Sequence, residues 1–311
     1  VRLVMAPHYA AAFFGGDEDN FEYPRYNFDV CFFRIYENGK PLASPDYLRW
    51  STAGVKEGDL VFVSGHPGKT QRLDTYARLL HLRDVNLPLR LQLLEDQYRI
   101  LTEFGKQGTE QARLAQHDQY SIANSLKAMR GQLAGLKTDS LLAGKKATED
   151  ALRKRVVTDL TTHPELSQAA SAWTTIEQSQ SKLTEFEKEL LLTEYRNAVP
   201  CTLYSLSRHI LRRSREMEKV STMRLREYRD SNRASLEQEL FSPAPISKEL
   251  EIAKLTGSFT LARKLLGADH ALPKKLLNGM EPAARAKQLV DGSTLLEVAS
   301  RKALAAKSYA E

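Results

Sequence analysis

Hydrophobic periodicity changes near residue 76 and divides the chain into two parts. Before that point, short runs of β-branched and aromatic residues are separated by turn residues. After it, apolar residues recur at three- and four-residue spacing over long stretches. Strands that precede the helices, instead of alternating with them, are typical of α+β proteins. We therefore predict an α+β protein with a β part at residues 1–75 and a helical domain at residues 76–311.

The β part is predicted to contain four strands, at residues 1–5, 29–37, 47–51 and 59–64. Asn38-Gly39 predicts a tight turn after the second of them. Four strands are too few to complete a barrel or a sandwich, so we expect this part to need further strands. The sequence also begins without an initiator Met or a signal peptide, and we expect it to be an internal fragment.

Helices are predicted at residues 87–104, 109–158, 164–195, 202–241 and 246–267, with shorter ones after Pro273 and Pro282. An antiparallel helical bundle attached to the β part would bury their apolar faces. No apolar run approaches the roughly 20 residues needed to span a bilayer, so no membrane association is expected. The two cysteines are too few for a disulfide framework.

The chain is mildly basic, with 45 Lys+Arg against 39 Asp+Glu, and residues 208–233 contain eight arginines. A phosphate-binding surface is one interpretation. Acidic residues alternate with these arginines at pairing distance along a helix, however, which favours a solvated, ion-paired face. We expect no nucleic-acid partner.

The densest polar cluster begins with the glycine pair Gly15-Gly16 and continues through Asp17, Glu18, Asp19 and Asn20 to Arg25. Three interpretations are open: a calcium loop, a solvent-exposed acidic turn, and the structured wall of a pocket. The aromatic, proline and arginine neighbours favour the pocket wall. No metal and no cofactor are predicted.

Asp29 stands at the start of an otherwise apolar strand. A carboxylate beside Val30, Phe32 and Phe33 is expected to be partly buried and to need a hydrogen-bond partner. It can serve as a strand cap, or it can hold a histidine in the correct tautomer. The residues alone leave both roles open.

Several motifs share their order and spacing with one known family. They are Val1-Arg2-Leu3-Val4, Ala6-Pro7, Phe14-Gly15-Gly16-Asp17, Asp19-Asn20, Pro24-Arg25, Asp29, Phe33-Arg34-x-Tyr36, Gly54-Val55-Lys56-Glu57-Gly58-Asp59, Ser64-Gly65-His66-Pro67-Gly68-Lys69-Thr70 and, more weakly, Asn124-x-x-Lys127-x-x-x-Gly131. The sequence thereby resembles the bacterial dipeptidyl-peptidase 7 and 11 family of serine exopeptidases. The resemblance implies that residues 1–75 form part of a chymotrypsin-like β-barrel. Residues 76–311 would then be a large inserted α-helical domain, incomplete at its C-terminal end.

The same resemblance implies roles for four residues. Asp29 would be the carboxylate of the catalytic triad, while Asn20, Phe21 and Asn124 would bind the free N-terminus of a peptide substrate. The sequence departs from the family at Phe21, where Trp is usual, and at Phe28, where Gly is usual. A Phe ring is the weaker partner for an ammonium group.

The catalytic base and nucleophile are not found. His66 follows Asp29, whereas the triad order in this fold is His, Asp, Ser, and Ser64 has no identifiable base. Both groups are expected outside residues 1–311.

The resemblance therefore implies a fragment of a serine-type dipeptidyl-peptidase that acts on peptides with a free N-terminus in the periplasm or outside the cell. A catalytically inactive relative that binds peptides or proteins is the alternative. A homodimer is left open.

Overall fold

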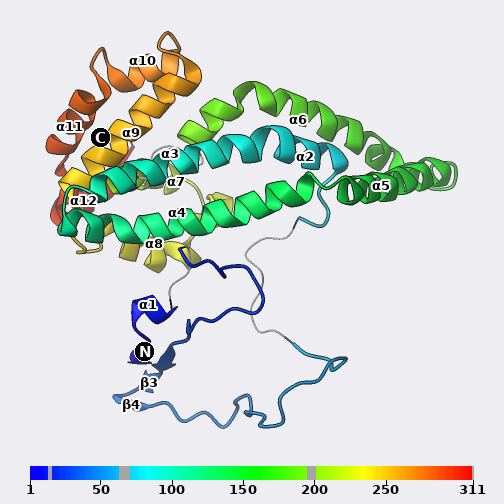
Figure 1. Ribbon diagram of the computed structural model, residues 1–311, viewed down its shortest axis with the longest axis horizontal. Coiled ribbons are helices and arrows are strands. Elements are labelled where there is room, and N and C mark those ends of the chain that lie inside the picture. The colour runs from blue at the N-terminus through cyan, green and yellow to red at the C-terminus, as the bar shows by residue number, and fades with distance from the viewer. Residues whose placement is uncertain (13–15, 63–70, 195–200, 310–311) are drawn as a thin grey trace.

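The computed structural model describes residues 1–12, 16–62, 71–194 and 201–309 of the chain (Figure 1). Its class is α+β, as predicted: short strands lie near the N-terminus and helices make up most of the remainder. Figure 1 shows the helices gathered into one body, while the N-terminal residues run along one side of it as an open chain. None of the helices in the described ranges is long and apolar enough to cross a membrane.

The N-terminal part contains two antiparallel sheets of two strands each, together with the short helix α1 (Tyr9–Ala12). The strands are β1 (Arg2–Met5), which pairs with β2 (Phe32–Arg34), and β3 (Tyr36–Glu37), which pairs with β4 (Lys40–Pro41). Asn38 and Gly39 join β3 to β4 with φ angles of 49° and 79°. Two successive residues with positive φ are what a tight hairpin turn requires, so the predicted turn is confirmed.

The strands predicted at residues 47–51 and 59–64 are not found over residues 47–51 and 59–62, and residues 63–64 lie outside the described ranges. A strand needs a neighbour to satisfy its backbone groups, and two-stranded sheets are only marginally stable. Side chains such as Leu48 and Trp50 are about nine-tenths exposed, at 92% and 90%. The described residues accordingly form no closed barrel.

The helical part begins with α2 (Tyr76–His81), which runs through a π-helical turn (Leu82–Asn86) into α3 (Leu87–Gly105). The helices that follow are α4 (Thr109–Leu136), α5 (Asp139–Asp159), α6 (Ser167–Thr193), α7 (Thr202–Glu216), α8 (Arg233–Leu240), α9 (Lys248–Leu266), α10 (Ala271–Leu277), α11 (Pro282–Asp291) and α12 (Val298–Ala305). The predicted helices at residues 87–104 and 246–267 are confirmed by α3 and α9. The helix predicted over residues 109–158 is divided into α4 and α5.

One unbroken helix over residues 202–241 is a wrong prediction, because α7 ends at Glu216 and three short 3-10 turns precede α8. The buried Glu216 carboxylate accepts hydrogen bonds from Leu225 N at 2.7 Å and from Lys219 Nζ at 2.6 Å. Tyr228 is also buried, and its hydroxyl lies 3.1 Å from His209 Nδ1. These contacts hold residues 217–232 in a turn-rich segment.

Within the described ranges, five of the eight arginines of residues 208–233 have an acidic partner, but only Arg233 pairs along a helix as predicted, with Glu237. Glu194, just after α6, pairs with Arg212 at 2.7 Å and with Arg208 at 2.8 Å. Hydrogen bonds from Arg212, and then from Arg208, hold the pKa of Glu194 below its ordinary value. Arg224 pairs with Asp230 at 2.8 Å. This pairing removes much of the free positive charge that binding a phosphate backbone requires.

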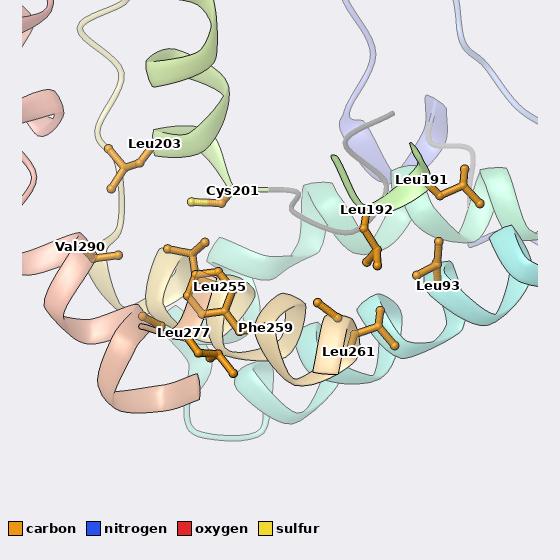
Figure 2. Packing of buried hydrophobic residues seen from close by; sticks show 12 residues of the cluster. Leu93, Leu191, Leu192, Cys201, Leu203, Leu255, Phe259, Leu261, Leu277 and Val290 are labelled. Carbon is orange, nitrogen blue, oxygen red and sulfur yellow. The ribbon is translucent and has the colours of Figure 1, made fainter. Parts of the chain in front are cut away.

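The hydrophobic core lies within the helical part. Figure 2 shows its largest cluster, in which Leu261 of α9 lies toward Leu192 of α6 and Leu93 of α3. Leu255 and Phe259 of α9 lie at the other end of the cluster, toward Leu277 and Val290. In the described parts of the chain, all four clusters of buried apolar residues are drawn from residues 82–305. The helical part therefore supplies its own core, and it offers a firm surface on which the N-terminal loop can dock.

Candidate functional site

The polar loop at residues 16–29 lies against α4 and brings two distant asparagines together. Asn20 is only 2% exposed, and its Nδ2 donates a hydrogen bond to Oδ1 of Asn124 at 2.9 Å. The two residues are 104 positions apart in the sequence. Asn20 and Asn124, which the sequence resemblance singles out, thus share one location in the fold.

Bonds within the loop fix its shape around Asn20. The backbone N–H of Glu22 donates to the carbonyl of Asp19 at 3.0 Å, and the Asp19 carboxylate accepts from Tyr26 N at 2.8 Å. Phe21 adopts a φ of 63° at the centre of this turn. A positive φ is uncommon for a bulky residue, so the turn must be held by the surrounding contacts. The Phe21 ring itself is 62% exposed.

A second residue of α4 also binds the loop. Lys127 Nζ donates to the carbonyl oxygen of Glu18 and to Glu22 Oε1, the latter at 2.8 Å. Because Lys127 follows Asn124 by three residues, both side chains lie on the same face of α4. The sequence places Lys127 in the motif Asn124-x-x-Lys127-x-x-x-Gly131, but it does not indicate that Lys127 holds the loop.

The bond between the two asparagines uses the amide nitrogen of Asn20, so the amide oxygen of Asn20 takes no part in it. Amide oxygens are acceptors, and an ammonium group has only donors to offer. An amide oxygen is therefore a chemically suitable partner for a cationic amine.

Asp29 is exposed, so the prediction of partial burial is wrong. Its neighbours Phe32 and Phe33 are themselves 54% and 62% exposed, because no element among the described residues covers this side of β2. The Asp29 carboxylate accepts from the Asn27 amide at 3.1 Å when that amide is oriented to satisfy both of its neighbours. In that orientation the Asn27 oxygen accepts from Arg25 Nη2 at 2.8 Å.

The acidic residues of the loop are engaged in protein contacts. Asp17 forms an ion pair with Arg25 at 3.0 Å, and Asp19 binds the backbone of Tyr26. Across the described parts of the chain, no group of three or more His, Cys, Asp or Glu side chains is arranged to hold a metal ion. The loop is thus built as a wall of hydrogen-bonded side chains.

Several motif residues fall outside the described ranges. They are Phe14, Gly15 and the run Ser64-Gly65-His66-Pro67-Gly68-Lys69-Thr70. The structure therefore unites the asparagine pair, and the contact that it gives the Asp29 carboxylate is with the Asn27 amide.

Comparison with known proteins gives a consistent assignment. The family profile described as peptidase S46 matches residues 1–311. The Asp/Glu-specific dipeptidyl-peptidase of Shewanella putrefaciens is 30% identical over 261 residues, which is 77% of this chain and 33% of that protein. The enzyme of the same name from Capnocytophaga gingivalis is 31% identical over 169 residues, or 50% of this chain and 24% of that protein.

A shorter match is closer in sequence. Dipeptidyl-peptidase 7 of Porphyromonas endodontalis is 39% identical over 83 residues, which is 23% of this chain and 10% of that protein. The chain spans a third or less of the length of each of these relatives. Since the family profile extends over every residue of the sequence, the chain belongs to the peptidase S46 family.

Proposed function

We propose that this chain is part of a serine-type dipeptidyl-peptidase, which releases dipeptides from the free N-terminus of peptides. Family membership and the names of the relatives support this activity. The observation that carries the proposal is the hydrogen bond between Asn20 and Asn124. It joins the β part to the helical part at the point where an amine could be bound.

In this proposal the asparagine pair and Phe21 bind the ammonium group of the substrate. An ammonium that leaves water needs acceptors in fixed positions, and an aromatic face adds about 0.5–2 kcal/mol. Because this amine site would be fixed two residues from the cleaved bond, the enzyme would release two residues at a time. Asp29 orients a histidine and stabilises the imidazolium that forms when the serine attacks.

We further propose that residues 1–75 form part of a chymotrypsin-like barrel, with the helical part as its insertion. The exposed apolar side chains of β1 and β2 support this arrangement, among them Leu3 at 59% and Phe33 at 62%. Further strands packed on these side chains would bury them, and would also surround Asp29. A carboxylate enclosed in this way orients a histidine better than one in open solvent.

The test uses the intact protein and chromogenic dipeptidyl substrates. Asp29→Ala should lower kcat about 10⁴-fold, as expected when a triad histidine loses its orienting carboxylate. Asn20→Ala and Asn124→Ala should chiefly raise KM, because they remove contacts to the amine. Full activity of Asp29→Ala would refute the proposal.

An intact wild-type protein that binds peptides without cleaving them would instead indicate the catalytically inactive relative. Location in the periplasm or outside the cell remains a prediction from the family resemblance, as does the homodimer that the sequence leaves open. Fractionation of cells that express the intact protein tests the first, and its mass in solution tests the second.

A further inference from the structure

Lys127 contacts the loop on both sides of Asn20. Its ammonium binds the carbonyl of Glu18, two residues before Asn20, and the carboxylate of Glu22, two residues after it. Asn124, one turn earlier on α4, binds Asn20 itself. Three contacts, at Glu18, Asn20 and Glu22, thus dock the turn onto one face of a single helix.

The contacts of Lys127 matter because the hydrogen bonds within the loop do not set the distance between the loop and α4. The hydrogen bonds of Asp19 with Tyr26 and Glu22 shape the turn, but both partners belong to the loop. The position of the loop on α4 depends on side chains that reach across from this helix. Lys127, whose side chain is 34% exposed and binds two loop oxygens, can supply such a contact.

The positive charge of Lys127 has a second consequence for the amine site. An unpaired ammonium close to the asparagine pair would repel the amine of a substrate, whereas Glu22 neutralises the charge of Lys127 at 2.8 Å. The ion pair thus holds the turn in place without opposing the ligand. Loss of Lys127 would release both the turn and the Glu22 carboxylate.

We infer that Lys127 is a positioning residue, which holds Asn20 against Asn124 and thereby sets how strongly a free amine is preferred over a blocked one. The inference rests on the proposed function, because it assigns Lys127 to the amine site of that enzyme.

The experiment compares Lys127→Met, Lys127→Arg and wild type in the intact protein. The readout is the ratio of inhibition constants for an N-acetylated dipeptide and for the same dipeptide with a free amine. Lys127→Met should lower this preference for the free amine about fivefold, the effect expected of a partly exposed charge pair. Lys127→Arg should retain most of it, since a guanidinium can bind the same two oxygens.

The matched control is Lys146→Met, which removes a lysine of α5 paired with Asp150 at 2.6 Å and 53% exposed. It should leave the ratio unchanged. If Lys127→Met weakens both inhibitors equally, or neither, then Lys127 does not position the amine site.

A second measurement separates this inference from the proposed function. Hydrogen exchange of residues 16–26 should be faster in Lys127→Met than in wild type, and unchanged in Lys146→Met. If the intact protein cleaves no dipeptidyl substrate, the proposed function fails while exchange still reports the docking contact. Equal exchange in Lys127→Met and wild type would overturn the positioning role even in an active enzyme.

Discussion

At the scale of single residues, Glu251 fixes the start of a helix. Its buried carboxylate accepts hydrogen bonds from Thr202 N at 3.0 Å and Leu203 N at 2.7 Å, at the N-terminus of α7. Glu251→Ala leaves these donors buried without an acceptor, so the free energy of unfolding should fall by about 2–4 kcal/mol. Urea unfolding measures this loss of stability.

The control is Glu249→Ala, at an exposed position of α9, the helix that also contains Glu251. It should change the free energy of unfolding by less than about 0.5 kcal/mol. Equal losses in both variants would contradict this role.

The two cysteines should differ sharply in reactivity. Burial, and next the Glu251 carboxylate, raise the pKa of the Cys201 thiol to about 12, whereas Cys31 is exposed. The thiolate is the reactive form, and at pH 8 a thiol with so high a pKa is almost entirely protonated. An alkylating reagent should therefore label Cys31 in the folded protein, and Cys201 only after denaturation. Peptide mapping by mass spectrometry checks this, and equal labelling rates in the folded protein would disprove it.

The chemistry of the individual residues predicts only part of the candidate site. The acidic composition of residues 15–25 indicates a polar loop, but it holds no signal that Asn20 would meet Asn124. That contact depends on how the loop docks on α4, which only the fold determines. The expected burial of Asp29 is wrong for a related reason, because burial depends on what covers β2 and not on the apolar neighbours of Asp29 in sequence.

At the scale of elements, the close approach of α3 and α9 depends on Gly257. A Cβ at this position would lie 2.9 Å from Cγ1 of Ile100 and closer still to its Cδ1. Gly→Ala normally stabilises a helix interior, but Gly257→Ala should lower the free energy of unfolding by about 1 kcal/mol or more, because Ile100 must move. Thermal unfolding of Gly257→Ala measures the loss.

The control is Gly144→Ala in α5, where an added Cβ meets nothing within 4 Å. This substitution should raise stability by about 0.5–1 kcal/mol. The double variant Gly257→Ala with Ile100→Ala should recover part of the loss if the clash is its cause. Stabilisation by Gly257→Ala alone would show that Ile100 yields without cost.

Helices could be predicted from the sequence where a periodic apolar pattern coincides with local signals such as a capping residue. The leucines of α3 and the capping Ser247 of α9, whose Oγ accepts from Leu250 N at 3.3 Å, mark those helices clearly. Residues 217–232 continue a helical pattern, yet Glu216 and Tyr228 bind partners that draw the chain into turns. The strands expected at residues 47–51 and 59–64 contain aromatic and β-branched residues, but their described parts lack neighbouring strands, and pairing is what makes a strand.

At the scale of the whole molecule, the two parts should differ in their capacity to fold. The four clusters of buried apolar residues that the described ranges contain all lie within residues 82–305. A shortened chain of residues 76–311 should therefore unfold cooperatively, with a helical circular dichroism spectrum. Residues 1–75 alone should give the spectrum of an unfolded chain, since isolated two-stranded sheets are marginal. A non-cooperative transition of the shortened chain would contradict this division.

The hydrogen bond between Asn20 and Asn124 spans 104 residues, and this separation has a consequence for biogenesis. During synthesis the loop leaves the ribosome long before α4 does, and a contact of such high sequence separation forms late. The amine site of the proposed enzyme would therefore be complete only after the helical part has folded onto the loop.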